Sequence, residues 1–142
     1  MPRVRIQMTG HRSDGFTEET VEETYPALLT EDGEKTILHY VMNSGNERIR
    51  CEMTMMPSRL TIQNRGAVES CLKLEPGLIG ISRYRTPYGS FPIETETEKL
   101  EVVKTGHGVF AEVAYSLLSD RTLINKSCLR ITVTPEEEAS SV

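Results

Sequence analysis

One hairpin signal constrains this chain more than any other feature of its sequence. Thr86-Pro87-Tyr88-Gly89 has proline at the second position of a turn and glycine at the fourth, which is the signature of a type I turn. The segments on both sides alternate with the period of two that a half-buried strand needs. If Thr86 and Gly89 close the turn, the register of the two strands is fixed. The predicted opposite pairs are Tyr84 with Phe91, Ser82 with Ile93, Gly80 with Thr95, and Leu78 with Thr97.

This register gives the hairpin one solvent-exposed face and one inner face. Two arginines and three glutamates fall on one face, and charged side chains belong in water, so the opposite face is predicted to be the inner one. A slip of one residue would bury those charges, at a cost of several kcal/mol each. The predicted outer residues are Ile79, Ile81, Arg83, Arg85, Glu94, Glu96 and Glu98. The predicted inner residues are Ser82, Tyr84, Phe91, Ile93, Thr95 and Thr97.

The same period of two recurs along most of the chain. Val4, Ile6 and Met8 alternate with polar residues near the start, and a similar alternation ends at Val133. We count about ten short strands, separated by turn signals at roughly the 8–12-residue spacing of an antiparallel sandwich or barrel. The pattern therefore predicts an all-β fold with no long helix.

The segment from residue 18 to residue 25 is ambiguous. Its glutamates suit the first turns of a short helix, whereas Pro26 and the turn pair Asp32-Gly33 favour a strand that enters a hairpin. Both interpretations stay open. If the segment is a strand, Pro26 belongs at an edge or a bulge, because proline cannot donate a hydrogen bond to a ladder.

Composition excludes several classes of protein. The 142 residues suffice for one domain, predicted to cover residues 1–134 and to be followed by an acidic, disordered tail over residues 135–142. A net charge of −5 argues against a protein that binds the nucleic acid backbone. No apolar run suits a signal peptide or a membrane span, and the three cysteines are odd in number and far apart. We therefore predict a cytoplasmic protein with reduced thiols that binds neither nucleic acid nor membrane.

Several scattered positions together resemble a known family. In order, the chain contains Arg65-Gly66-Ala67-Val68, Gly77, Tyr84-x-Thr86 with Gly89, Thr95 and Thr97, Gly108, and Tyr115-x-Leu117. This pattern resembles the YwiB-like family of small, uncharacterised bacterial proteins with a lipocalin-like (calycin) β-barrel. The resemblance implies an antiparallel up-and-down barrel of about eight to ten strands, and it implies no activity. The chain has no Trp and so lacks the Gly-x-Trp signature of true lipocalins, whose transport role is not transferred.

No constellation for catalysis or metal binding stands out in the sequence. The three histidines are isolated and there is no Cys-x-x-Cys pair, so we expect no metal site and no cofactor. Cys51 is predicted on an inner face among apolar residues, which is a packing position. No nucleophile motif such as Gly-x-Ser-x-Gly occurs, and we expect no enzymatic activity.

The predicted interior supplies the leading hypothesis about function. Small barrels either fill with side chains or enclose one small ligand, and buried hydroxyl groups need partners. We predict that a small, partly apolar molecule binds inside the barrel. Its predicted hydrogen-bond partners are Tyr84, Thr95, Thr97 and Tyr115, and its predicted apolar contacts are Phe91 and Ile93. The open alternative is a filled barrel with a satisfied internal hydrogen-bond network.

The outer face supplies a second hypothesis. Ile79 and Ile81 are predicted to face outward beside Arg83 and Arg85, and solvent alone explains two adjacent exposed isoleucines poorly. A partner protein or a second copy of the chain would cover them. The alternative function is therefore a non-enzymatic interaction or homo-oligomerising module, with a homodimer as the simplest case.

Overall fold

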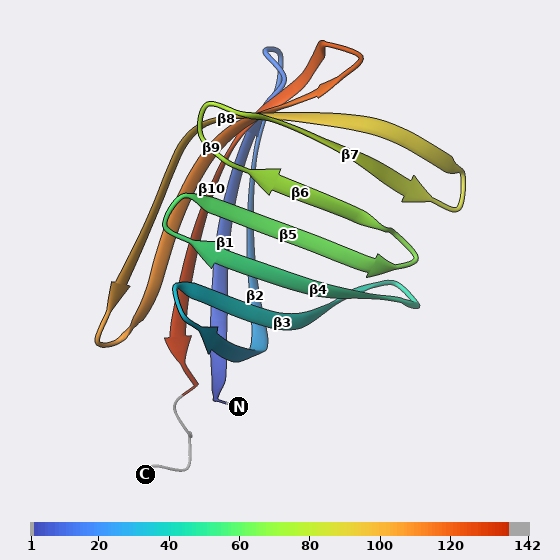
Figure 1. Cartoon of the computed structure of the whole chain (residues 1–142). Coiled ribbons are helices and arrows are strands. Elements are labelled where there is room, and N and C mark those ends of the chain that lie inside the picture. Colours follow the sequence, from blue (N-terminus) through green and yellow to red (C-terminus); the bar gives the residue numbers. More distant parts are fainter. Residues whose placement is uncertain (1, 137–142) are drawn as a thin grey trace.

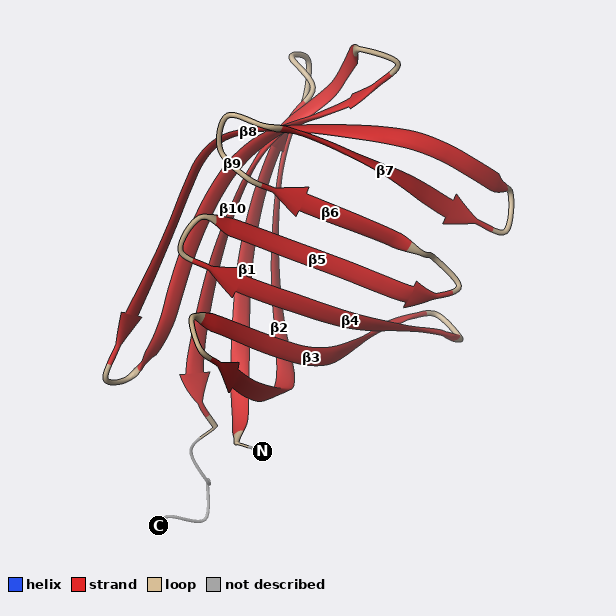
Figure 2. Cartoon of the chain, in the orientation of Figure 1, coloured by secondary structure: helices blue, strands red, loops and turns tan. Residues whose placement is uncertain are grey.

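The computed structural model describes residues 2–136, which form strands joined by short turns. No helix lies among these residues (Figure 2). In chain order the strands are β1 (Arg3–Ser13), β2 (Glu18–Asp32), β3 (Lys35–Ser44), β4 (Glu47–Met56), β5 (Arg59–Gly66), β6 (Ser70–Leu74), β7 (Ile79–Thr86), β8 (Gly89–Thr105), β9 (Gly108–Ser119) and β10 (Thr122–Pro135).

The strands form one antiparallel sheet in the order β6-β5-β4-β3-β2-β1-β10-β9-β8-β7. Strands that follow each other in the chain are neighbours in the sheet, except for β6 and β7, and β1 pairs with β10. The edge strands β6 and β7 approach each other and nearly close the sheet into a barrel (Figure 1). The predicted all-β, up-and-down barrel of eight to ten strands is confirmed.

The barrel is flattened into two layers that two long strands share. In Figure 1, β3 to β6 cross β1, β9 and β10 at a steep angle. β8 pairs with β7 through Glu96 and with β9 from Glu94 onward, and its register shifts at a bulge between Thr97 and Lys99. β2 pairs with β1 up to Leu28 and with β3 from Leu28 onward. The corners of the barrel are therefore made within β2 and β8.

The core is the space between the two layers. Along β9, the inward side chains of Val109, Ala111 and Val113 are buried, and they alternate with partly exposed residues. The largest fully buried hydrophobic side chains come from both layers, and they are Ile6, Leu38, Met53, Met55, Leu60, Leu74, Val113 and Ile131.

The central hairpin has the predicted register. Thr86 pairs with Gly89, whose φ of +142° favours glycine. The observed pairs include Tyr84 with Phe91, Ser82 with Ile93, and Gly80 with Thr95. The predicted pairing of Leu78 with Thr97 is wrong. The Leu78 N–H closes a turn onto the Glu75 carbonyl at 3.1 Å, and Pro76 forms the bridge to Thr97 instead.

The ambiguous segment from residue 18 to residue 25 is a strand, and Pro26 lies within that strand as well. Pro26 pairs with Arg5 on one side and precedes the pairing with β3 on the other, which agrees with the predicted edge position. At the far end of the chain, Pro135 still pairs with Val4, so the last strand ends one residue later than predicted. The predicted disorder of residues 137–142 lies outside the described residues.

Backbone and side-chain hydrogen bonds join β6 to the β7–β8 hairpin, and we call this junction the β6–β7 seam. One backbone bridge joins Glu69 and Arg85 through N–H···O bonds of 2.9 and 2.8 Å. Farther along, the Ser82 hydroxyl accepts from the Cys71 N–H at 3.3 Å, and the Thr95 hydroxyl donates to the Lys73 carbonyl at 3.2 Å. The seam is thus closed partly by side chains.

Gly80 makes this close approach possible. A β-carbon at Gly80 would lie 2.6 Å from the Thr95 Oγ1 and 2.7 Å from the Lys73 carbonyl oxygen. Both distances are shorter than a carbon atom tolerates, so any side chain at this position would push β6 away from the hairpin.

Candidate functional site

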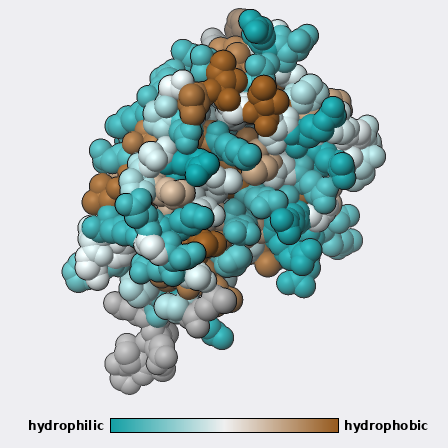
Figure 3. Space-filling model, in the orientation of Figure 1, coloured by the Kyte–Doolittle hydropathy of each residue, from teal (hydrophilic) through white to brown (hydrophobic). Residues whose placement is uncertain are grey.

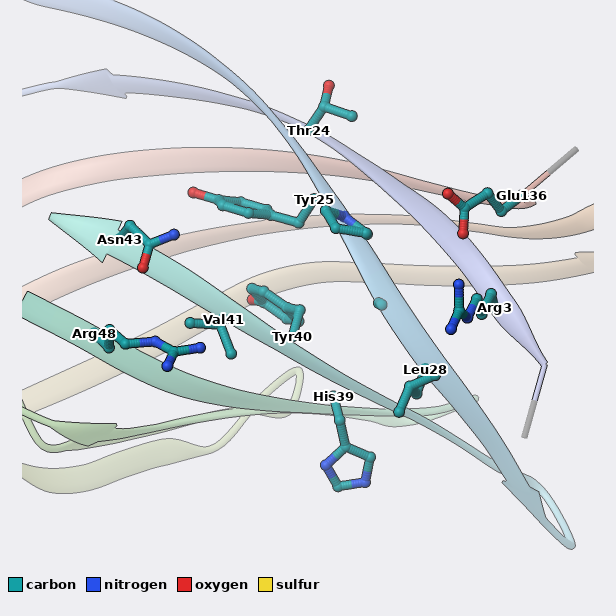
Figure 4. A pocket seen from close by; sticks show the side chains of 12 residues that line it. Arg3, Thr24, Tyr25, Leu28, His39, Tyr40, Val41, Asn43, Arg48 and Glu136 are labelled. Atoms are coloured by element: carbon teal, nitrogen blue, oxygen red, sulfur yellow. The ribbon is translucent and has the colours of Figure 1, made fainter. Parts of the chain in front are cut away.

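A cleft opens where β2 and β3 part. The two strands pair between Leu28–Asp32 and Lys35–His39, and they diverge beyond the pair of Leu28 with His39. The space between them is about 680 Å³, within the range of small-molecule sites. We call it the β2–β3 cleft. Its lining residues are Arg3, Thr24, Tyr25, Pro26, Ala27, Leu28, His39, Tyr40, Val41, Asn43, Arg48 and Glu136 (Figure 4).

Two tyrosines form the floor of the β2–β3 cleft. The rings of Tyr25 and Tyr40 have centroids 5.2 Å apart and an interplanar angle of 30°. The Tyr25 hydroxyl donates to the Glu23 carboxylate, two residues earlier on the same face of β2. Tyr40 is only 6% exposed and packs into the core. The floor therefore combines aromatic surface with polar tips, which suits a partly apolar ligand.

Burial keeps the groups beneath the cleft protonated. Cys51 lies opposite Tyr40 in the β3–β4 ladder, and its thiol donates to the Ile49 carbonyl at 3.7 Å. Burial raises the pKa of the Cys51 thiol to about 11. Burial, and then the nearby Cys51 and Glu23, raise the pKa of the Tyr40 hydroxyl above its ordinary value. Cys51 lies in the core, as its predicted packing position requires, and its thiol is a poor nucleophile near neutral pH.

Charged side chains stand at both ends of the cleft. In Figure 4, Arg48 and Asn43 lie at one end and Arg3 and Glu136 at the other, with the tyrosine floor between them. Asn43 and Arg48 are opposite each other in the β3–β4 ladder. The Glu136 N–H donates to the Arg3 carbonyl at 3.1 Å. A ligand in the cleft would meet aromatic surface in the middle and charge at its ends.

The predicted interior residues lie in different parts of the barrel. Thr95 uses its hydroxyl in the β6–β7 seam. Thr97 pairs with Tyr115 in the β8–β9 ladder, and its buried Oγ1 has no hydrogen-bond partner among the described residues. Ile93 is partly buried in the β7–β8 hairpin. Their predicted role in holding a ligand stays a prediction.

Tyr115 borders a smaller cavity near the other end of the barrel. This cavity is about 140 Å³, and Arg12, Glu23 and Ser127 also line it. Burial raises the pKa of the Tyr115 hydroxyl. The cavity is well below the usual volume of a small-molecule site, so it is a weaker candidate than the β2–β3 cleft.

Tyr84 and Phe91 depart from the burial predicted for the inner face of the hairpin. They pair with each other as predicted, but 37% and 51% of their surfaces are exposed. β8 pairs with β9 only from Glu94 onward, so the tip of the hairpin projects beyond the opposite layer (Figure 1). The expectation that these two side chains lie inside the barrel is therefore wrong.

The predicted outer face is observed. Ile79 and Ile81 are 61% and 76% exposed, and Arg83 and Arg85 beside them are exposed as well. Arg85 forms an ion pair with Glu69 at 3.2 Å. Figure 3 shows hydrophobic side chains gathered on the surface at the top of the view, in the region where β7 begins in Figure 1.

Two further findings concern other classes of site. Among residues 2–136, no three His, Cys, Asp or Glu side chains gather closely enough to hold a metal ion. No helix in that part of the chain is long and apolar enough to cross a membrane. The expected lack of a metal and of a cofactor stays a prediction.

Comparison with known proteins now identifies the family. The profile of a family described as a domain of unknown function (DUF1934) matches residues 6–131. The chain belongs to this family. No curated protein matches the chain. The crystal structure of the ywiB protein from Bacillus subtilis is similar, with a TM-score of 0.86, 14% identity, and coverage of 96% of this chain and 93% of that one. Together the DUF1934 match and this fold confirm the resemblance to the YwiB-like family.

The alternation of the sequence does not reveal the β2–β3 cleft of this DUF1934 chain. Tyr25 and Tyr40 alternate with exposed residues like other inward residues, and alternation does not tell where two neighbouring strands separate. Pro26 was the available signal. A residue without an N–H group suits a stretch of β2 that has left its neighbour β3.

Proposed function

We propose that this DUF1934 protein is a non-enzymatic binding protein whose partly apolar ligand occupies the β2–β3 cleft. The observation that carries the proposal is an open cavity of about 680 Å³ with an aromatic floor and charged ends. Ligand sites of this size combine an apolar lining with a few polar groups that fix orientation, and the cleft has both.

The proposed ligand site lies outside the barrel interior that the sequence pattern suggested. The closed part of the barrel is occupied by fully buried side chains such as Leu38, Met53, Leu60 and Leu74. A ligand there would have to displace a packed core, at several kcal/mol for each large side chain removed. The cleft can be entered from solvent without such a loss.

A binding role fits the chemistry beneath the cleft better than catalysis does. The Cys51 thiol, with its pKa raised to about 11, remains protonated near neutral pH. Tyr40 is likewise held neutral, because burial raises its pKa. Tyr40 and Cys51 are therefore neutral hydrogen-bonding groups rather than an activated base or nucleophile.

Native mass spectrometry of protein purified from its own host tests this proposal. We expect a mass above the 16.0 kDa of the chain, reporting a retained ligand. Thr24→Trp places a bulky side chain at an exposed position of the cleft lining and should abolish retention, whereas Ile81→Trp on the β7 face should not. A bare mass for the wild type, with no NMR shifts at Tyr25 or Tyr40 on adding partly apolar compounds, would refute the proposal.

We also propose a second function, an interaction surface on the outer face of β7. Beside the exposed Ile79, one row across the ladders carries Ile81, Leu118 and Leu123 on β7, β9 and β10, and Glu94 on β8 interrupts it. A second copy or a partner protein would cover this surface. Sizing at micromolar concentration should show a dimer that Ile81→Lys converts to a monomer. A wild type that is monomeric and binds no protein would argue against both forms.

A further inference from the structure

Two strand edges face each other across the β2–β3 cleft. The β2–β3 ladder begins at Leu28 and His39, so residues 18–27 of β2 and 40–44 of β3 extend beyond it (Figure 1). Each of these stretches pairs on its other side, β2 with β1 and β3 with β4. Each therefore presents one edge to the cleft.

The edge of β2 is protected against pairing. The Leu29 N–H donates to the Pro2 carbonyl at 3.0 Å, so the backbone groups of Leu29 face β1. Backbone direction alternates along an antiparallel strand, which turns Thr24 and Pro26 toward the cleft. Pro26 has no N–H to offer, and Glu22 adds negative charge to the same edge. Proline and charge are the means by which natural edge strands discourage a new partner.

The edge of β3 lacks this protection. The same alternation, counted from the pair of Leu28 with His39, turns the backbone groups of Val41 and Asn43 toward the cleft. Both residues line the cleft, and both have an N–H donor and a carbonyl acceptor to offer. An edge of this kind is a template for an added strand.

A group of arginines lies on β4 and β5, across β3 from its open edge, on the outer face of the sheet. Arg50 is directly opposite Arg65 in the β4–β5 ladder, and Arg48 lies two residues earlier on the same face of β4. Among residues 2–136, no carboxylate lies within ion-pair distance of these three side chains. With its amide turned so that the oxygen faces Arg65, Gln63 accepts from Arg65 Nη2 at 3.0 Å. Glu52 is an acidic residue near them. It lies two residues after Arg50 on the same outer face of β4.

Two like charges directly opposite each other destabilise a sheet, and an anion from outside would relieve that repulsion. His39 connects the two regions, because it lines both the β2–β3 cleft and the neighbouring cavity of about 170 Å³ that Arg50 and Arg65 also line. The chain as a whole is acidic, with a net charge of −5, so a cationic group beside an open strand edge is a local feature.

We propose that the β3 edge binds an extended peptide segment with alternating acidic and apolar residues, which adds to the sheet as a strand in the β2–β3 cleft. This inference rests on the proposed function and names its ligand class. The acidic β2 edge repels such a segment while the arginines beside β3 attract it, so the two edges are not equivalent docking places.

The alternation follows from the geometry of an added strand, because successive side chains point to opposite faces. Beside Val41, one set of the peptide's side chains extends the outer face toward Arg48 and Arg50, where carboxylates form charge-assisted contacts. The other set points inward over Tyr25 and Tyr40 and is therefore apolar.

Fluorescence anisotropy with labelled eight-residue peptides tests the proposal. A peptide of four Glu-Val repeats should bind, and its affinity should fall as salt is added. Four Lys-Val repeats should bind at least tenfold more weakly. A Glu-Val peptide with N-methyl groups on the amides that face β3 should also lose at least tenfold, because it cannot donate to the edge.

Protein variants separate binding from folding. Arg50→Glu turns the like-charged pair with Arg65 into an attractive pair, so the variant should be at least as stable as the wild type and still bind the Glu-Val peptide at least tenfold more weakly. Arg83→Glu changes the net charge equally but lies on β7, and it should leave affinity within twofold.

Amide exchange measured by NMR locates the bound strand. The bound peptide should slow exchange of the Val41 and Asn43 amides and leave that of Thr24 unchanged. Equal binding of the Glu-Val and Lys-Val peptides, or protection at Thr24 instead, would overturn the proposal. If no peptide binds while a partly apolar compound still occupies the cleft, the peptide inference fails and the proposed function stands. If neither binds, both fail.

Discussion

Two gaps between strands of the barrel, the β6–β7 seam and the β2–β3 cleft, differ in how they are filled. At the β6–β7 seam, the hydroxyl groups of Ser82 and Thr95 reach across and bond to the backbone of β6. At the β2–β3 cleft, the ladder stops at Leu28 and His39 and the strands diverge around an open cavity. One gap is closed and the other is left open.

Single residues account for the difference between the closed seam and the open cleft. Gly80 has no side chain, so β6 can lie against the hairpin, and the hydroxyl of Thr95 opposite Gly80 replaces a missing backbone partner. On β2, Pro26 faces the cleft and has no backbone N–H to donate to β3. Tyr25 and Tyr40 fill the space beneath the gap instead. The closed seam is thus held by side-chain hydrogen bonds, and the open cleft retains a stretch of β3 that forms no ladder with β2.

The largest expected effect comes from opening the closed seam. Gly80→Val would place carbon atoms within 2.7 Å of the Lys73 carbonyl oxygen, and overpacking of this kind costs about 3 kcal/mol of unfolding free energy. Urea denaturation measures the loss. Gly106→Ala is the control, because its β-carbon would meet nothing within 4 Å. A Gly80→Val variant as stable as the wild type would show that β6 does not need this close approach.

The floor of the open cleft should give stability a dependence on alkaline pH. The folded pKa of Cys51 is about 11 against 9.0 for an ordinary thiol, so its contribution is complete below pH 9 and is lost as the pH rises through about 11. The expected loss is roughly 2–3 kcal/mol. Denaturation midpoints between pH 8.5 and pH 11 measure it. Cys51→Val should flatten this part of the curve, and an unchanged curve would contradict the assignment.

A smaller effect on stability is expected when Thr95, whose hydroxyl is hydrogen-bonded, is compared with Thr97, whose hydroxyl has no such bond among residues 2–136. Thr95→Val removes the hydroxyl that bonds to Lys73 and should cost about 1 kcal/mol, because a partly buried carbonyl loses its partner. Thr97→Val removes a buried hydroxyl without a partner among the described residues, so it should be neutral or stabilising. Thermal denaturation of both variants measures the contrast. Equal losses would show that the Thr95 bond contributes nothing special to the seam.

The smallest expected effect on stability comes from Arg50, near the open cleft. Arg50→Glu should raise the unfolding free energy by roughly 0.2–1 kcal/mol, because it replaces repulsion from Arg65 by attraction across the β4–β5 ladder. The gain should shrink in high salt. A double-mutant cycle with Arg65→Gln measures the pairwise energy, and a coupling near zero would mean that solvent already screens the two arginines.

Local chemistry predicted one side of the barrel well. Pro87 and Gly89 define a turn within four residues, and the register of Tyr84, Ser82 and Gly80 follows from counting outward. The error at Leu78 arose because a turn from Glu75, and contact with another part of the chain, decide where β7 begins. Strand existence and register are encoded by neighbours in sequence, whereas strand ends depend on tertiary contacts.

Most of the candidate site could not be predicted from the sequence, because it also depends on tertiary contacts. Alternation assigns a residue to a face, but it does not tell how far a strand extends past the opposite layer. Tyr84 and Phe91 were placed on the correct side of their strands and still lie at an exposed tip. The β2–β3 cleft depends on how β2 bends away from β3, and its sequence trace is a single proline, Pro26.

The pairing of β1 with β10 also bears on how the barrel folds. β1 lies between β2 and β10, so one of its edges has no partner until the final strand has been synthesised. Contacts that span nearly the whole chain cost loop-closure entropy and slow the folding of β proteins. During that interval the apolar residues Val4 and Ile6 lie on a strand with an open edge, which other nascent chains could pair with. During synthesis, β1 therefore waits longer for its second neighbour than strands whose partners follow directly in the chain.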